Sequence, residues 1–355
     1  MQLGISLGYW GVGSDASGLQ LAQEADRLGF AVAWAAEAYG SDAATVLGYL
    51  AAHPERIGLG SAVFQIPGRT PARTAMTAAT LDTLSGGRFR LGLGVSGPQV
   101  SEGWHGVRFD RPLSRTREYV EVVRLALDRQ VVRHDGEHFT LPLPDGPGKA
   151  LRLTIGTVQE HLPIYLAALG PKNLELAGEI ADGWLGLFFS PDHAEESLQH
   201  LRAGRAKVGK DLVGFDVAPT VPLVVGDDVE ACAAAVRSYA ALYLGGMGSK
   251  NQNFYHALAT RMGFGDAADA VQERYLARDY EGAAAAVPLE FIDATSLLGP
   301  RDRLVTRMNE FARAGVTTLT VQPYASSPDG QRRALQVAAE ALDLSEAAGR
   351  DPIHR

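Results

Sequence analysis

The sequence predicts an α/β protein that folds as a (β/α)8 TIM barrel. Eight short apolar runs alternate with eight longer segments, and several of the longer segments carry apolar residues at i, i+3 and i+4 spacing. Strict alternation of strands and helices favours a parallel sheet with right-handed crossovers. Eight such units in one chain favour a closed barrel over an open doubly wound sheet.

The expected elements follow one another from the first residues onward. The apolar runs predict strands at residues 3–7, 31–35, 57–64, 89–93, 164–168, 184–187, 217–225 and 316–321. The helical patterns lie between them, at residues 15–28, 42–53, 71–84, 112–130, 172–181, 192–207, 227–243 and 325–348. Gly29, Gly86, Gly87 and Gly315 each stand between a helix and a strand, where a left-handed residue ends the helix. We expect these glycines at the face of the barrel that serves stability, outside any cofactor site.

Two stretches are too long to be simple connections. Residues 131–162 predict a hairpin or excursion after the helix that follows strand four, and residues 244–300 predict further helical material between strands seven and eight. Long insertions at one face of a scaffold usually form lids or partner surfaces. No internal repeat or domain boundary is visible, so residues 1–355 are expected to form a single domain.

The composition excludes several classes of protein. Glycine provides 40 of the 355 residues without a Gly-X-Y period, which excludes collagen and indicates many special turns. Cys232 is the single cysteine, so neither a disulfide framework nor a cysteine-built zinc site is possible. A net charge of −8 argues against nucleic acid or an anionic membrane as partner. We expect a cytoplasmic protein, because no signal segment and no apolar run of roughly 20 residues is visible.

Glycines at the end of strand four match a dinucleotide motif in spacing only. Gly92, Gly94 and Gly97 have the GxGxxG spacing, but that fingerprint opens a helix directly after the first strand of a βαβ unit. Here Pro98 follows and no helix is expected before about residue 112. We therefore interpret the segment as a small-residue loop that lets an anion or a flat ring approach the backbone, or as a tight turn.

The end of strand five predicts a phosphate site. Gly170 and Pro171 precede Lys172 and Asn173 at the start of a helix. Free backbone N–H groups and one lysine at a helix N-terminus suit a phosphate. Proline at the first helical position is also ordinary capping chemistry. Two glycine-rich ends on adjacent strands together favour a phosphate-bearing cofactor.

Polar residues near the strand ends are candidates for acid–base chemistry. Glu37 ends an apolar strand, where its carboxylate can accept a ring N–H, act as acid or base, or cap a helix. Asp42 is expected to be a cap, and Asp182 a turn residue at the opposite face. Three residues follow strand four and can reach a substrate: Trp104, His105 and Arg108. No spacing indicates a metal site or a hydrolase nucleophile elbow.

Three stretches resemble the luciferase-like monooxygenase superfamily of flavin and deazaflavin oxidoreductases. They are residues 59–63 (LGSAV), 84–94 (LSGGRFRLGLG) and 169–173 (LGPKN) with 176–183 (LAGEIADG). The resemblance extends from Leu3 to Val321. Residues 95–104 are similar to an actinobacterial branch of coenzyme F-420-dependent oxidoreductases.

The resemblance implies a barrel with coenzyme F-420, or alternatively FMN, across its C-terminal mouth and a non-prolyl cis peptide at Ala62–Val63. It implies ring contacts by Glu37 and Gln65 and a bulge behind the central ring at Ala62 and Val63. It further implies that one loop lies near the ring and ribityl chain, formed by Val95, Ser96 and Gly97. A second loop lies near the phosphate, formed by Leu169, Gly170, Lys172 and Asn173.

One departure from the family bears on the reaction. Ala38 and, approximately, Pro98 stand where sugar-phosphate dehydrogenases of this superfamily have a histidine and a glutamate for proton handling. Oxidation of a sugar phosphate by that mechanism is therefore not expected. Tyr9, Tyr39 and His105 are the candidate proton donors.

The leading hypothesis is hydride transfer between coenzyme F-420 and a small organic substrate held under the two insertions, without oxygen incorporation. The alternatives are an FMNH2-dependent monooxygenase, a cofactor-binding protein without turnover, and a metal-free barrel lyase that uses Lys172. Apolar helices and the net charge permit a homodimer.

Overall fold

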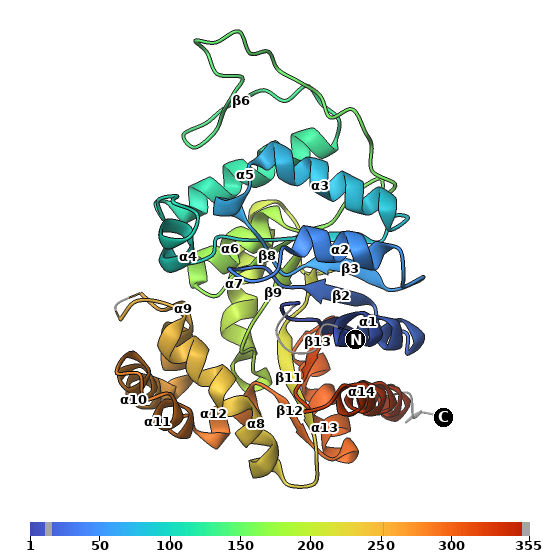
Figure 1. Cartoon of the computed structure of the whole chain (residues 1–355), viewed down its shortest axis with the longest axis vertical. Coiled ribbons are helices and arrows are strands. Elements are labelled where there is room, and N and C mark those ends of the chain that lie inside the picture. Colours follow the sequence, from blue (N-terminus) through green and yellow to red (C-terminus); the bar gives the residue numbers. More distant parts are fainter. Residues whose placement is uncertain (11–15, 251, 350–355) are drawn as a thin grey trace.

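A parallel sheet forms the centre of the protein, whose computed structural model describes residues 1–10, 16–250 and 252–349. In the described residues the sheet has eleven strands: β1 (Gln2–Ser6), β2 (Val32–Ala35), β3 (Gly58–Ser61), β4 (Phe64–Gln65), β5 (Phe89–Gly94), β8 (Ile164–Ala167), β9 (Gly183–Leu185), β10 (Asp216–Val217), β11 (Thr220–Val225), β12 (Leu297–Gly299) and β13 (Thr318–Pro323). Helices surround these strands (Figure 1).

The sheet curls so that its distant ends approach each other. Its strands follow the order β10-β9-β8-β5-β3-β2-β1-β13-β11-β12, with β4 paired beside β5. At one end the N–H of Thr220 in β11 donates to the carbonyl of Gly186, 2.9 Å away, and Thr220 forms a parallel bridge with Leu187. The architecture is therefore an α/β fold with a curled parallel sheet, as the alternation of elements predicts.

All eight predicted strands are present, with three corrections. The predicted strand 217–225 is divided into β10 and β11. Pro219 lies between them and has no N–H to donate to a neighbouring strand. The predicted strand 57–64 is divided at Ala62 and Val63 into β3 and β4. Strand β12 was not predicted and lies in the predicted insertion 244–300, where it pairs with β11.

Helices cover the outside of the sheet. Those expected from the sequence are α1 (Ala16–Arg27), α2 (Ala43–Ala51), α3 (Pro71–Leu84), α5 (Pro112–Leu127), α6 (Pro171–Ile180), α7 (Ala194–Lys207), α8 (Val229–Ala241) and α14 (Pro328–Gly349). The first predicted helix begins at residue 15, outside the described residues. Two helices were not predicted, α4 (Pro98–Gly103) and α13 (Arg301–Arg313).

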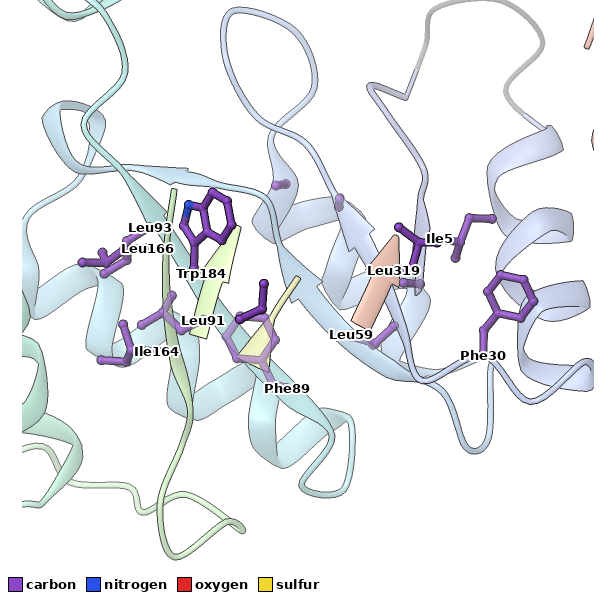
Figure 2. Packing of buried hydrophobic residues seen from close by; sticks show 14 of the residues in the cluster. Ile5, Phe30, Leu59, Phe89, Leu91, Leu93, Ile164, Leu166, Trp184 and Leu319 are labelled. Carbon is purple, nitrogen blue, oxygen red and sulfur yellow. The ribbon is translucent and has the colours of Figure 1, made fainter. Parts of the chain in front are cut away.

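Apolar side chains fill the space between strands and helices. Figure 2 shows Leu91 and Leu93 of β5 beside Ile164 and Leu166 of β8, all essentially buried. Because side chains alternate along a strand, these residues share one face of the sheet. Burial of this face against the helices provides the main stabilisation of the fold.

Two aromatic side chains fill the other face of the curled sheet. Trp34 and Tyr165 lie edge to face, with ring centroids 5.2 Å apart. Glycines on other strands make room for them, because a Cβ at Gly60 would lie 2.2 Å from the Trp34 ring and one at Gly183 would lie 2.3 Å from the Tyr165 ring. Part of the glycine excess therefore serves close packing of aromatic rings, which the glycine count alone did not predict.

The N-terminal ends of the strands carry the features expected of a stability face. Gly29 and Gly315 both adopt positive φ, 82° and 90°, directly after a helix, as predicted. Asp182 lies in the bend before β9, as predicted, and it also holds an ion-pair network together. Its carboxylate accepts the N–H of Ile164 at 2.8 Å and pairs with Arg124 and with His161.

Removal of the Asp182 carboxylate is expected to lower the free energy of unfolding by about 1–3 kcal/mol, because it leaves the Ile164 N–H and Arg124 without their acceptor. Burial raises the pKa of Asp182, but Arg124 and the Ile164 N–H outweigh it and hold the pKa below the ordinary value. This stabilisation is therefore present at neutral pH and is lost as pH falls below about 3.9. Urea unfolding of Asp182→Asn between pH 7 and pH 3 measures this stabilisation. Asp145→Asn, in an exposed loop, is the control. Equal losses in both variants would contradict the assignment.

The two long stretches differ in structure. Residues 131–162 contain the short antiparallel hairpin of β6 (His134–Asp135) and β7 (Thr140–Leu141), which projects from the body of the protein (Figure 1). The second stretch contains the π-helices η3 (Leu242–Gly246) and η4 (Thr260–Phe264) and the helices α9 (Phe254–Ala259), α10 (Gly265–Leu276), α11 (Tyr280–Ala285) and α12 (Leu289–Ala294). Among the described helices, none combines the length and the apolar character needed to cross a bilayer.

Candidate functional site

Strand register brings the predicted site loops to one edge of the sheet. Ala35 of β2 pairs with Ser61 of β3, and Gln65 of β4 pairs with Gly94 of β5. Farther along, Leu93 of β5 pairs with Leu166 of β8. The segments that follow these residues therefore meet at the C-terminal ends of the strands, which we call the mouth. Active sites of barrel enzymes lie at this face.

The peptide between Ala62 and Val63 is cis, as the family resemblance implies. The segment lies directly beside β5, because a Cβ at Gly94 would lie 2.6 Å from Cγ2 of Val63. Valine has a stiff, branched side chain that cannot move away easily. Gly94 is therefore a glycine because Val63 packs against it, whereas the sequence had suggested that a ligand does.

Gln65 and Ser96 connect two loops at the mouth. The Gln65 side chain is buried, and its Nε2 donates to the carbonyl of Ala38, 2.6 Å away. The Ser96 hydroxyl donates to Oε1 of Gln65 at 3.1 Å, from a residue with φ of 61°. Both ends of the Gln65 amide are thus held by the protein. Contact of Gln65 and Ser96 with a ring remains a prediction.

Glu37 forms an ion pair with Arg69, which was not among the predicted site residues. Its Oε2 lies 2.9 Å from Nη2 of Arg69 and accepts the N–H of Ala43 at 3.0 Å. Arg69 also pairs with Asp42 at 2.6 Å and lies over the Phe64 ring. Burial lowers the pKa of Arg69, but Glu37 and Asp42 outweigh it and raise the pKa. The structure thus favours the helix-capping interpretation of Glu37, and its ring contact remains a prediction.

Asp42 caps α2 through the N–H of Thr45, as predicted.

The loop after β8 opens into helix α6. Gly170 is the N-cap, Pro171 is the first helical residue, and Lys172 and Asn173 lie in the first turn. A Cβ at Gly170 would meet no atom within 4 Å, so open space lies beside its Cα. Lys172 is exposed, and among the described residues no carboxylate forms an ion pair with it.

Arg261 of η4 fixes the same loop from a distant part of the chain. Its Nη2 donates to the carbonyl of Leu169 at 2.9 Å, and its Nε lies 3.0 Å from Oε1 of Glu196. Arg69 and Arg261 are the site residues that sequence reasoning missed. No local signal marks them, because Arg261 lies 92 residues beyond the loop that it contacts.

The loop after β5 contains a helix that was not expected. Helix α4 begins at Pro98, directly after the N-cap Gly97, so the absence of a helix was a wrong reason for rejecting a dinucleotide site. The helix has only six residues and follows β5, which is not the first strand of the chain, so the βαβ context of that fingerprint is still missing. A small hollow lies beside Val95 and includes Phe109 in its wall.

The polar candidates of this loop have separate surroundings. His105 packs against Gly68, where a Cβ would lie 2.8 Å from its Cε1. Its Nε2 is buried without a partner among the described residues. Trp104 is exposed, and Arg108 lies 3.8 Å from Glu102 in an exposed ion pair. The structure therefore favours a packing role for His105 over proton donation.

Comparison with known proteins identifies the family. The profile of the family described as luciferase-like monooxygenase matches residues 12–318. A Mycobacterium tuberculosis protein, provisionally named a coenzyme F420-dependent oxidoreductase, is 41% identical over 328 residues, covering 90% of this chain and 94% of the relative. The 5,10-methylenetetrahydromethanopterin reductase of Archaeoglobus fulgidus is 32% identical over 311 residues, covering 86% of this chain and 88% of the relative.

A solved structure is similar in fold over nearly the whole chain. The coenzyme F420-dependent tetrahydromethanopterin reductase of Methanopyrus kandleri superimposes with a TM-score of 0.82 and 24% identity, covering 96% of this chain and 97% of the other. At that identity the similarity concerns the fold. The profile matches well over half of the chain, and both sequence relatives exceed 30% identity over most of it, so the chain belongs to the luciferase-like monooxygenase family.

Proposed function

We propose that this protein binds coenzyme F-420 at the mouth and is an oxidoreductase that transfers a hydride between it and a small organic substrate. The observation that supports this most directly is the open N-terminus of α6, where Gly170 leaves space and Lys172 has no carboxylate partner among the described residues. The 41% identical relative named for dependence on coenzyme F420 supports the choice of cofactor. When bound, the reduced deazaflavin supplies the hydride.

The residues present fit such a cofactor. A phosphate is stabilised by the N–H groups and positive end of a helix and by one lysine, and α6 with Lys172 provides both. At the other side of the mouth, a Cβ at Gly97 would approach only Oε1 of Gln99, at 3.6 Å, so a flat ring can lie close to this backbone. Val63, Gln65 and Ser96 are fixed by packing or hydrogen bonds and would orient the ring without rearrangement.

A binding titration with both cofactors tests the proposal. We expect coenzyme F-420 to bind the purified protein tightly and FMN to bind weakly, as measured by native mass spectrometry and by cofactor fluorescence. Tight FMN binding with negligible coenzyme F-420 binding would contradict it. Oxygen consumption with a substrate would favour the monooxygenase, and retained cofactor without redox change across a broad substrate panel would favour a binding protein.

Replacement of Lys172 by methionine is expected to weaken coenzyme F-420 binding by about 5- to 30-fold. The reason is that a charge-assisted contact of an exposed lysine contributes about 1–2 kcal/mol. Lys210→Met, at another exposed lysine near the end of α7, is the control and should bind normally. Unchanged affinity in Lys172→Met would place the phosphate elsewhere. Loss of cofactor binding with any cofactor-free activity retained would also exclude the lyase hypothesis.

We further propose that residues 1–355 form one domain with excursions at about 131–162 and 244–300. The homodimer and the cytoplasmic location stay predictions from the sequence.

A further inference from the structure

Three tyrosine rings surround Phe188, and a fourth packs against one of them. Tyr239 lies in α8, Tyr243 in η3 and Tyr255 in α9, and their ring centroids are 5.6, 5.7 and 6.1 Å from that of Phe188. Tyr324 joins them through Tyr239, at 5.6 Å. We call Tyr239, Tyr243, Tyr255 and Tyr324 the tyrosine cluster. The cluster comes from three helical elements and one strand end, so folding alone brings it together.

The tyrosine cluster lies at the mouth. Tyr324 directly follows β13, and its N–H donates to the carbonyl of Leu223 in β11 at 2.9 Å. Phe188 follows β9 and adopts a φ of 53°, which is uncommon for a phenylalanine and directs the ring among the tyrosines. Tyr9 follows β1, and the pairing of Ile5 with Val321 places it at the same edge as Tyr324.

The hydroxyl groups of the cluster have no protein partner. Among the described residues, none of the four forms a hydrogen bond through its hydroxyl, and their contacts with one another are between rings. Each ring is only partly buried. Burial raises the pKa of all four phenols, and the closeness of Tyr9 raises the pKa of Tyr239, Tyr243 and Tyr255 further. The phenols therefore stay protonated and can donate.

One buried amide positions two members of the cluster. Nδ2 of Asn253 donates to the carbonyls of Tyr243 and Leu244, at 2.9 and 2.8 Å. Its Oδ1 accepts the N–H groups of Tyr255 and His256, at 2.9 and 3.1 Å. Asn253 thus joins the irregular π-helix η3 to the start of α9. A fixed arrangement of this kind is expected of a binding site, because it avoids ordering costs on binding.

We propose that the tyrosine cluster is the substrate pocket and that it takes an uncharged apolar molecule with a carbonyl or hydroxyl oxygen, which the phenols bind by donating hydrogen bonds. Aromatic walls bind an apolar ring or chain, and several free donors at one place require an acceptor oxygen. An ionised substrate would lose its hydration without gaining a countercharge. That this ligand exchanges a hydride with the cofactor rests on the proposed function. That it binds at the tyrosine cluster does not.

The test uses the cofactor-free protein and three molecules of one shape: cyclohexanone, cyclohexanecarboxylate and cyclohexylammonium. Dissociation constants follow from NMR titration of the tyrosine ring signals. We expect cyclohexanone to bind at least about 10-fold more tightly than either ion. Aromatic rings also attract cations, so tighter binding of cyclohexylammonium would overturn the proposal, as would equal binding of all three.

Variants test the role of the hydroxyls separately. Tyr243→Phe and Tyr255→Phe keep the rings and remove one donor each, and we expect each to weaken cyclohexanone binding about 3- to 10-fold. Tyr280→Phe, an exposed tyrosine of α11, is the control and should bind normally. Unchanged binding in both cluster variants would overturn the assignment of the oxygen site. Because no cofactor is present, a failure of coenzyme F-420 to bind would leave these results interpretable.

Discussion

Gly94→Ala is expected to lose most coenzyme F-420 binding and to lower the free energy of unfolding by about 1–3 kcal/mol. The new Cβ would lie 2.6 Å from Cγ2 of Val63, and overpacking of this kind forces backbone shifts. Gly94 is paired with Gln65 across β4 and β5, so the shift moves the Gln65 amide and its bonds to Ala38 and Ser96. Urea unfolding and a coenzyme F-420 titration measure the two effects.

Gly97→Ala is the matched control for stability. Gly97 has extended backbone, with φ of −130°, and a Cβ there meets only Oε1 of Gln99 at 3.6 Å. We expect its unfolding free energy to stay within about 0.5 kcal/mol of the wild type. If Gly94→Ala were as stable as Gly97→Ala, the contact between Gly94 and Val63 would not be the reason for glycine at position 94.

Asn253→Asp is expected to lower the free energy of unfolding by about 2–4 kcal/mol. The carboxylate cannot donate to the buried carbonyls of Tyr243 and Leu244, and it brings a negative charge against them. Because η3 and α9 then lose their connection, Tyr243 and Tyr255 should separate and cyclohexanone binding should fall at least as much as in Tyr243→Phe. Urea unfolding measures the loss of stability, and the same NMR titration measures the loss of cyclohexanone binding.

Asn253→Ala separates the two halves of this interaction. Aspartate keeps the acceptor that caps α9 through Tyr255 and His256, whereas alanine loses both the cap and the donors. We expect aspartate to be at least as destabilising as alanine, although it retains the cap. A nearly neutral Asn253→Asp would mean that the cap provides the whole stabilisation and that the carbonyls do not need Asn253.

Much of the fold follows from local pattern. Each of the eight strands predicted from apolar runs has a counterpart in the curled sheet, because burial against helices on the outside selects apolar residues locally. Short or interrupted elements were missed: β12 has three residues and α4 has six, which is too few to produce a period. Pro219 lies between β10 and β11, whereas a single strand was predicted across it.

Local sequence patterns were enough to predict the α/β class, the glycines that end helices and the loops at the strand ends, since each depends on residues close together in the chain. The partners of those loops could be identified only from the folded structure. Arg69 pairs with Glu37, Arg261 donates to the carbonyl of Leu169, and Val63 packs against Gly94. Three tyrosines from separate elements surround Phe188. These contacts join residues tens of positions apart, and packing in three dimensions, not local propensity, selects them.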